Sequence, residues 1–482
     1  MYLKKIISLF FGIILIYNAK AQHNTSHNYV WPKDSLVMSN LKGWQDLKFG
    51  LFMHWGTYSQ WGVVESWSLC PEDEEWCKRQ GKYAYNYQEY VKAYENLQKT
   101  FNPVNFNPEK WAAAAKEAGM KYVVFTTKHH DGFCMFDTKE TDYKITSPVC
   151  PFSKSSKSNV TKEIFNIFRE KGFLTGAYFS KPDWNSDAYW WRYFPPKNRN
   201  ATYDPAKYPE RWSAFKNFTF NQIKELMTNY GKIDILWLDG GWVRPISSID
   251  TNISWQKTIP FNQDIDMPRI AGMARSLQPG LMIVDRTVEG EFENYVTPEQ
   301  TVPDKPLDHP WESCITMGKS WSYVPGDQYK TANELIHLLI NVVSKGGNLL
   351  LNIGPSSDGD WDPIAYQRLK EIGSWMKING AAIYNSVPLY PYLENNMVYT
   401  RSKDNKTIYI YILSNKNEDD LILPAELVIE KLSIPAGSKI SLMANTSRVF
   451  KWRQEQGKTF IKIPQDMQGK AIWKYALVLS IR

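Results

Sequence analysis

Long apolar runs are scarce in this chain of 482 residues. The pronounced one, residues 6–17, is about a dozen residues long and too short to cross a bilayer comfortably. It follows Lys4-Lys5 and precedes Ala19-Lys20-Ala21, a small-x-small cleavage pattern, so it predicts an export signal that is removed before Gln22. No cysteine stands at that point to carry a lipid. We therefore expect an exported protein, periplasmic or secreted, without membrane insertion.

An excess of one charge sign is also missing. The chain has 57 Lys and Arg against 50 Asp and Glu, a net charge of +7. The export signal carries three lysines and no acid, so the net charge falls from +7 to +4 in the mature chain. A mild excess spread over a long chain is not the footprint of a nucleic-acid-binding protein.

Cysteine is sparse, and nucleotide-binding loops are absent from the sequence. The spacings of the five cysteines match no zinc motif, and an odd count leaves at least one thiol outside any intramolecular disulfide. Cys70 and Cys77 either pair or remain buried thiols. Gly240-Gly241 and Gly346-Gly347 lack the partner residues of a phosphate-binding loop. We therefore expect no cofactor.

What the sequence does contain, up to about residue 382, is a regular alternation of strands and helices. The strands are apolar throughout, which is typical of parallel strands buried on both faces. Asn107-Pro108 and Asp362-Pro363 begin two helices, and Thr331 with Glu334 forms a capping box for a third. The expected strands are 49–55, 122–128, 174–180, one that ends at Asp239, 281–286, 312–316 and 348–354.

These units predict an α/β fold, a (β/α)8-like barrel of the TIM type, over residues 22–382. The alternative is an open doubly wound sheet, which binds ligands at one crevice. Polar residues follow many of the strands here, and this favours a barrel, whose sites lie at the carboxyl ends of its strands. Short β runs separated by turn residues predict a C-terminal β-sandwich over residues 383–482.

Three of the buried strands end in ionisable side chains. The run 234–238 ends in Asp239, the run 122–128 leads into His129-His130-Asp131, and the run 281–284 leads into Asp285-Arg286. A single acid at a strand end most often caps the next turn. Polar groups at several strand ends converge on one face of a barrel, and such convergence indicates an active site.

Paired carboxyl groups on the two sides of a glycosidic bond are what glycoside hydrolysis requires. In retaining enzymes one carboxylate is the nucleophile and the other group is the acid/base, about 5–5.5 Å away. Asp239 is the candidate nucleophile. Spacing alone does not choose the acid among Glu289, Glu291, Glu293, Glu299 and Glu312.

Several separated motifs of the chain resemble, in order, signatures of the α-L-fucosidases of glycoside hydrolase family 29. The resemblance extends from about residue 41 to 386, whereas the C-terminal sandwich agrees in type and position only. The motifs are Lys48-Phe-Gly-Leu-Phe-Met-His54-Trp-Gly56, Lys128-His-His-Asp-Gly-Phe133, Trp237-Leu-Asp-Gly240, Leu349-Leu-Leu-Asn-Ile-Gly-Pro355, Gly359, Ile372-Gly-Ser-Trp375 and Asn379-Gly380.

The resemblance implies a retaining mechanism in which Asp239 attacks the anomeric carbon. The acid/base of this family stands in a Thr-x-Glu context after a strand that ends in arginine. Thr297-Pro298-Glu299, 13 residues beyond Arg286, matches that context. Glu299 is therefore the predicted acid/base, followed by Glu312 and then Glu293.

The resemblance also implies a set of sugar-binding residues. Glu65 and Trp67 correspond to a Glu-Trp pair of the family, but Ser66 separates them here, and which of the two contacts sugar stays open. Trp321 is either a platform beyond the sugar pocket or a core residue. The predicted substrate-binding residues are His54, Glu65, Trp67, His129, His130, Tyr178, Trp237, Arg286 and Trp321.

Three histidines at two strand ends also allow a zinc site. Against this alternative, no H-x-H or H-E-x-x-H spacing is present, and adjacent histidines on one strand point to opposite faces. The resemblance makes His54, His129 and His130 neutral hydrogen-bonding partners of sugar hydroxyls. We therefore predict no metal ligands.

The predicted function is the exo-acting release of terminal α-L-fucose from a fucosylated oligosaccharide or glycoconjugate. The first alternative is an exo-glycosidase for a fucose-like sugar such as α-L-galactose, because only the shape of the pocket separates the two substrates. A non-catalytic sugar-binding protein and a metal hydrolase are the alternatives from other classes. The sequence does not indicate the linkage or the oligomeric state.

Overall fold

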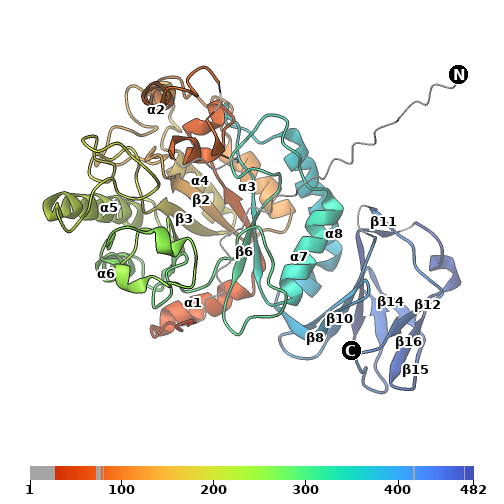
Figure 1. Ribbon diagram of the computed structural model, residues 1–482. Helices are drawn as coiled ribbons and strands as arrows, with labels where there is room; N and C mark the ends of the chain where they lie inside the picture. Colours follow the sequence, from red (N-terminus) through yellow and green to blue (C-terminus); the bar gives the residue numbers. More distant parts are fainter. Residues whose placement is uncertain (1–27, 72–76, 80, 416–417, 472) are drawn as a thin grey trace, which may run out of the picture.

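The computed structural model describes residues 28–71, 77–79, 81–415, 418–471 and 473–482. The predicted export signal lies outside these residues. The larger domain is built on a curved parallel sheet (Figure 1) whose strands lie in the order β5, β4, β3, β2, β1, β7, β6. Their bounds are β1 Phe49–Met53, β2 Tyr122–Lys128, β3 Leu174–Ser180, β4 Ile235–Asp239, β5 Met282–Asp285, β6 Glu312–Thr316 and β7 Asn348–Asn352.

An irregular segment, residues 292–300, fills the place of an eighth strand between the edge strands β5 and β6. On one side the Asn294 amide donates to Ile283 of β5 at 2.9 Å. On the other side the Glu312 amide of β6 donates to Val296 at 2.9 Å, and the Gln300 amide donates to Cys314 at 3.0 Å. The segment thus satisfies both edges, and the sheet closes into the predicted barrel-like fold, which is confirmed.

Helices surround the strands, as parallel crossovers require (Figure 1). Several begin where the sequence predicts. The Asn107 side chain accepts from the Lys110 amide, Asp362 accepts from the Ile364 amide, and the capping box of Thr331 and Glu334 is formed. The helices are α1 Ser35–Gln45, α2 Tyr87–Glu95, α3 Pro108–Glu117, α4 Val160–Glu170, α5 Pro209–Asn229, α6 Met267–Leu277, α7 Ala332–Ser344 and α8 Pro363–Ile383.

The C-terminal part is the predicted β-sandwich, with its own apolar core. A six-stranded antiparallel sheet, in the order β14, β13, β18, β10, β9, β8, faces smaller sheets of three strands (β12, β16, β15) and two strands (β11, β17). The bounds are β8 Ser386–Glu394, β9 Met397–Ser402, β10 Ile408–Leu413, β11 Asp420–Leu421, β12 Glu426–Ile429, β13 Ile440–Leu442, β14 Asn445–Phe450, β15 Trp452–Glu455, β16 Lys458–Lys462, β17 Trp473–Lys474 and β18 Ala476–Ile481.

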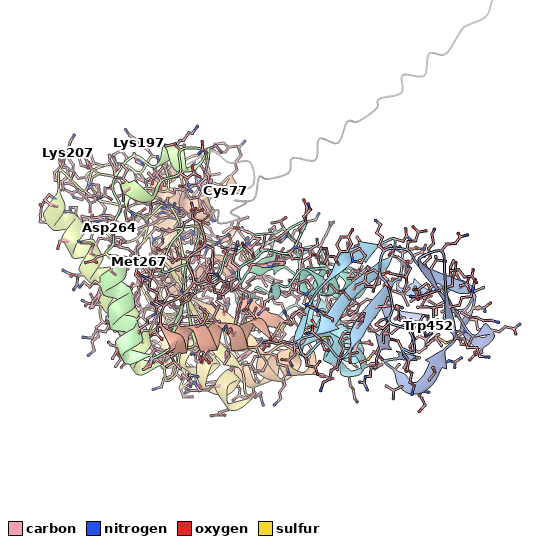
Figure 2. The ribbon with its side chains drawn as sticks, turned by 90° about the horizontal axis from the view of Figure 1, so that it is seen from below. Cys77, Lys197, Lys207, Asp264, Met267 and Trp452 are labelled. Atoms are coloured by element: carbon pink, nitrogen blue, oxygen red, sulfur yellow. The ribbon has the colours of Figure 1, made fainter. Side chains whose placement is uncertain are left out.

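Helices α7 and α8 lie between the barrel and the sandwich (Figure 1) and bind both. The Trp375 indole of α8 donates to the Ala476 carbonyl at 2.9 Å, and His337 of α7 bonds the Tyr475 carbonyl at 2.8 Å. Seen from below, the molecule is elongated, with Trp452 of the sandwich and Lys207 at opposite ends (Figure 2). Among the described residues, no helix is long and apolar enough to cross a membrane.

All five cysteines are buried. Cys134, Cys150 and Cys314 are free thiols in the barrel domain. Burial raises the pKa of the Cys150 thiol to about 11, so this side chain behaves as a small apolar residue.

Candidate active site

Asp239 is the last residue of β4, and two neighbours bind its carboxylate at the carboxyl end of the barrel. Tyr178 of β3 donates its hydroxyl to Oδ2 at 2.8 Å, and Arg286 donates Nη1 to Oδ1 at 3.1 Å. Burial alone would raise the pKa of Asp239, but the charge of Arg286 and the Tyr178 hydrogen bond hold it well below its usual range. The carboxylate is therefore ionised, and 15% of its side chain remains exposed, as a nucleophile needs.

Glu299 is brought to the same place by the segment that closes the barrel. It forms a bridge with Cys314 of β6, and its carboxylate pairs with Nη2 of Arg286. One guanidinium thus holds both carboxylates, with Asp239 on Nη1 and Glu299 on Nη2. About a quarter of the Glu299 side chain is exposed (25%), so a substrate can reach it. Two carboxyl groups side by side are what a retaining glycosidase requires.

The other acidic candidates lie elsewhere. Glu312 is the first residue of β6, at the opposite end of that strand from the site, and it is fully buried. Glu293 is also buried and accepts from the Thr287 amide at 3.0 Å. Glu289 is half-buried and Glu291 is exposed, on the turn after β5. Glu299 shares its partner Arg286 with Asp239, whereas Glu293 and Glu312 bond other groups.

Glu312 has a different part in the barrel. Its carboxyl group accepts from the Tyr122 hydroxyl at 2.6 Å and from the Trp237 indole at 3.3 Å, and so fixes the ring of Trp237 from below. Burial raises its pKa from 4.5 to about 8. The folded protein therefore keeps a proton on Glu312 at neutral pH, whereas the unfolded chain releases it near 4.5.

Replacing Glu312 by Gln tests this buried proton. Between pH 4.5 and 8 the folded state binds more protons than the unfolded state, so Glu312 makes stability fall as the pH rises through that window. The free energy of unfolding can be measured by urea titration at several pH values. We expect the stability of Glu312→Gln, relative to the wild type, to increase between about pH 5 and about pH 8. A difference that stays constant with pH would mean that Glu312 titrates alike in both states.

Three histidines line the site beside Asp239. Each is almost completely buried, and each uses Nδ1 for a partner behind the site: Asn352 at 2.8 Å for His54, Ser66 at 2.5 Å for His129, and Ser180 at 2.7 Å for His130. Burial lowers the pKa of His54 to about 4 and that of His130 to about 3, and it also holds the pKa of His129 well below the ordinary value. The rings are therefore neutral at physiological pH.

The prediction that His129 and His130 point to opposite faces of a strand is wrong. Strand β2 ends at Lys128, so strand alternation does not apply to the two rings, and their centroids lie 4.2 Å apart. His129, His130 and Asp239 each offer one ligand atom, and these atoms lie within 4.8 Å of one another. The Arg286 guanidinium stands 3.1 Å from the same Asp239 carboxylate. Its fixed positive charge opposes a cation at this position.

Glu65, Ser66 and Trp67, in the short helix η2 Glu65–Leu69, reach the site in three different ways. Glu65 is buried and accepts from the Ser322 amide at 2.8 Å, and the carboxylates of Glu299 and Asp239 add to the burial that raises its pKa to about 8. Trp67 packs edge-on against His130, with ring centroids 5.3 Å apart. The residue that separates the pair thus belongs to the site as well.

Aromatic rings form the walls of the site. Trp237 stacks on Tyr178 at 5.4 Å, and Arg286 lies over the same indole. Trp321 lies 5.0 Å from the His54 ring and is partly buried, and it also packs against the apolar cluster inside the barrel, so it belongs both to the site wall and to the edge of the core. The structure thus gathers around Asp239 all the residues that the sequence predicts to bind substrate.

Further aromatic residues at the site were missed by the sequence analysis. Trp184 and Trp242 both pack against the His130 ring, at 5.2 and 5.1 Å. The Arg199 guanidinium lies over the Trp67 ring at 4.8 Å, and its backbone carbonyl accepts from both the Trp184 and the Trp242 indoles. These residues stand in long loops after β3 and β4, where no periodic pattern marks them.

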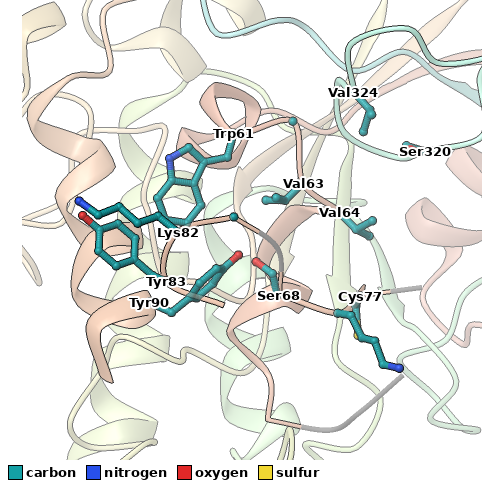
Figure 3. A pocket seen from close by; sticks show the side chains of 13 residues that line it. Trp61, Val63, Val64, Ser68, Cys77, Lys82, Tyr83, Tyr90, Ser320 and Val324 are labelled. Atoms are coloured by element: carbon teal, nitrogen blue, oxygen red, sulfur yellow. The ribbon is translucent and has the colours of Figure 1, made fainter. Parts of the chain in front are cut away.

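A cavity of about 630 Å³ adjoins the site without containing any predicted site residue (Figure 3). Val64 and Ser68, which line it, flank the Glu65–Trp67 segment, and Ser320 and Val324 flank Trp321. Trp61 and Tyr90 line it as well (Figure 3). The cavity therefore borders the segments that carry Glu65 and Trp321.

Two strand-end residues were also missed, although the sequence held a signal for them. Ser180 ends β3 and Asn352 ends β7, just as Asp239 ends β4. The rule that polar strand ends of a barrel converge applies to all three. Ser66 carried no such signal, because its contact with His129 joins residues 63 positions apart.

Comparison with known proteins agrees with this geometry. A sequence model described as α-L-fucosidase matches residues 16–381. The tissue α-L-fucosidase of Rattus norvegicus is 30% identical over 416 residues, which is 82% of this chain and 82% of that protein. The tissue α-L-fucosidase of Homo sapiens is 28% identical over 464 residues, or 92% of this chain and 90% of that protein.

A solved structure shows the same similarity. The α-L-fucosidase isoenzyme 1 from Paenibacillus thiaminolyticus superimposes with a TM-score of 0.71 at 27% sequence identity. The alignment covers 93% of this chain and 99% of that one, so it includes both the barrel and the sandwich.

Proposed function

Since this chain belongs to the α-L-fucosidase family, we propose that it hydrolyses terminal α-L-fucosides with Asp239 as nucleophile and Glu299 as acid/base. The observation that supports this assignment is the shared guanidinium of Arg286, which holds both carboxylates at the carboxyl end of the barrel. The reaction retains the configuration of the anomeric carbon. The substrate is a fucosylated glycan.

In the first step the ionised Asp239 attacks the anomeric carbon. The bond from that carbon to the leaving oxygen breaks, and Glu299 gives its proton to this oxygen. The product is a fucosyl ester of Asp239. Arg286 holds Oδ1 of this carboxylate and the Tyr178 hydroxyl holds Oδ2, so the two donors fix its orientation.

In the second step Glu299, now a carboxylate, takes a proton from water. The water oxygen attacks the anomeric carbon, the ester bond breaks, and Asp239 is released as a carboxylate. Each of the two displacements inverts the carbon, so the fucose leaves with its original configuration.

The neutral histidines and the aromatic walls form the proposed sugar site. His54, His129 and His130 offer ring nitrogens to hydroxyl groups, while Trp237 and Trp321 offer apolar faces. Fucose has a methyl group where galactose has a hydroxymethyl group, and apolar ring faces suit the methyl group.

Purified protein assayed on an aryl α-L-fucoside beside the matching aryl α-L-galactoside tests the substrate. An apolar pocket discriminates against an added hydroxyl by about 10²-fold, so we expect kcat/KM to favour the fucoside by that order. Equal rates, or a preference for the galactoside, would move the assignment to the fucose-like sugar. Binding of fucose without turnover of either substrate would favour a sugar-binding protein.

The same assay with a chelator tests the metal hydrolase alternative. The charge of Arg286 beside Asp239 opposes a divalent ion, so we expect EDTA to leave the rate unchanged. If EDTA abolishes activity and added zinc restores it, the protein is a metal hydrolase.

We also propose that the protein is exported and cleaved before Gln22. The support is the order of Lys4-Lys5, the apolar run 6–17 and the small-x-small site at 19–21. The N-terminal sequence of the protein recovered outside the cytoplasm tests this cleavage.

A further inference from the structure

We propose that the partners behind the three site histidines fix their tautomers, so that the cavity presents hydrogen-bond acceptors at His54 and His130 and a donor at His129. Ser180, Asn352 and Ser66 are the positioning residues that set this polarity. The tautomers follow from hydrogen-bond chains in the protein itself. Only their use by a sugar rests on the proposed function.

The chain behind His130 runs through Ser180. The Ser180 hydroxyl donates its single proton to the Pro182 carbonyl at 2.7 Å. At the His130 Nδ1 atom, 2.7 Å away, Ser180 can then only accept. Nδ1 of His130 therefore carries the ring proton, and Nε2 is an unprotonated acceptor.

The chain behind His54 runs through Asn352 and gives the same result. The Asn352 amide nitrogen donates to the Trp321 carbonyl at 2.6 Å, and this contact settles which way the amide group points. Its oxygen therefore faces Nδ1 of His54, at 2.8 Å, and an amide oxygen only accepts. Nδ1 of His54 carries the proton, and Nε2 is again an acceptor.

The chain behind His129 has the opposite polarity. The Asp131 amide donates to the Ser66 oxygen at 2.9 Å, so this contact gives no place for the hydroxyl proton. Among the described residues, the other side-chain hydrogen-bond contact of the Ser66 hydroxyl is Nδ1 of His129, at 2.5 Å. Nδ1 of His129 therefore accepts, and the ring proton lies on Nε2. A proton on Nδ1 instead would leave this fully buried hydroxyl without an acceptor in the part of the chain that the structure describes.

The surroundings of the rings agree with this polarity. All three rings are buried and neutral, so each has one proton to place. Nε2 of His130 lies 3.8 Å from the Asp239 carboxylate, beyond hydrogen-bond length, as expected of two acceptors. Tyr178 and Arg286 supply the donors that this carboxylate needs.

The polarity has consequences for what binds. A sugar hydroxyl that faces His54 or His130 must donate its proton to the ring. A sugar hydroxyl that faces His129 must accept the proton of that ring. Because Nδ1 of His129 bonds Ser66, a metal ion at His129, His130 and Asp239 would need a lone pair on Nε2 of His129, where the proton lies. Moving that proton to Nδ1 would leave the Ser66 hydroxyl without its acceptor. This cost adds to the repulsion between Arg286 and a metal ion.

The tautomers can be observed directly, without substrate. In protein labelled with 15N in its histidine rings, long-range proton–nitrogen correlation spectra at neutral pH distinguish protonated from bare ring nitrogens. Single His→Gln variants assign the three rings among the seven histidines. We expect the proton on Nδ1 in His54 and His130 and on Nε2 in His129. A proton on Nε2 of His54 or His130, or on Nδ1 of His129, would overturn the proposal.

Ser66→Ala tests the positioning role on its own ring. Without the hydroxyl, His129 should populate both tautomers, while the His54 and His130 signals stay as in the wild type. We expect kcat/KM on an aryl α-L-fucoside to fall by about 10–100-fold, the usual effect of losing an orienting partner. Ser344→Ala, which removes a buried hydroxyl on α7 remote from the site, is the matched control and should change neither readout.

The failures of the two proposals can be told apart. The expected tautomers in a protein that does not turn over α-L-fucosides would leave this inference standing and refute the proposed function. Turnover with an unchanged His129 spectrum in Ser66→Ala would refute the role of Ser66 alone. Replacing one sugar hydroxyl at a time by fluorine removes a donor, so fluorine should weaken binding most where the hydroxyl faces His54 or His130.

Discussion

Asp239→Asn is expected to reduce turnover of any α-L-fucoside by roughly 10⁴-fold or more, because it removes the attacking oxygen charge while keeping the size of the side chain. In the wild type, the Tyr178 hydroxyl and Arg286 stabilise the Asp239 carboxylate. In the variant, the asparagine amide replaces one oxygen of this carboxylate by a hydrogen-bond donor. Binding of fucose should survive far better than kcat. Steady-state kinetics and fucose titration measure the two effects separately.

Asp234→Asn is the matched control for this variant. Asp234 stands at the other end of β4, where its carboxylate accepts from the Thr175 amide at 2.9 Å. The control should keep the wild-type kcat, whatever its effect on stability. Trapping with a 2-fluoro sugar adds an independent readout, since mass spectrometry should find the label on Asp239. An adduct on another side chain, or substantial turnover by Asp239→Asn, would refute the nucleophile.

The barrel strands could be predicted because their apolar runs end sharply at polar residues. The expected ranges 122–128, 174–180 and 312–316 coincide with β2, β3 and β6. The ranges 281–286 and 348–354 extend past β5 and β7, because residues beyond the last ladder bond leave the sheet. Arg286 is one of them, and it turns toward Asp239 and Glu299.

The segment that closes the barrel could not be predicted from the sequence. Residues 292–300 show neither a strand nor a helix period, and they bind β5 and β6 through single bridges and not a continuous ladder. Their pairing depends on two edge strands whose positions are fixed only in the folded sheet. The acid/base candidate therefore came from the Thr-x-Glu resemblance and not from a strand-end rule.

The site was predictable where strand ends or motifs marked it, and not where loops meet. Asp239 ends a buried strand, and His129 and Arg286 directly follow one. Trp242 and Ser66 reach the same rings from loops, and their contacts with His130 and His129 join segments far apart in sequence. Sequence spacing carries no information about such contacts.

Glu299→Gln is expected to separate substrates by their leaving groups. In a natural glycan the leaving group is a sugar hydroxyl, which is a poor leaving group unless its oxygen receives a proton. Hydrolysis of such a glycan should therefore fall by about 10²–10⁴-fold. An aryl fucoside with an acidic phenol leaves without that proton, so formation of the Asp239 ester should stay fast. The second step still lacks its base, and the phenol should therefore appear in a burst equal to the enzyme concentration, followed by slow turnover.

The second step also distinguishes Glu299 from its rivals. Azide needs no base, so it should accelerate breakdown of the ester in Glu299→Gln and give a fucosyl azide with the configuration of the substrate. Glu291→Gln, on the exposed turn of the same region, should behave as the wild type on both substrates. An equal loss on glycan and aryl substrate would mean that Glu299 does not act on the leaving oxygen. Burst kinetics in Glu293→Gln or Glu312→Gln instead would transfer the role, although both side chains are buried and bond other partners.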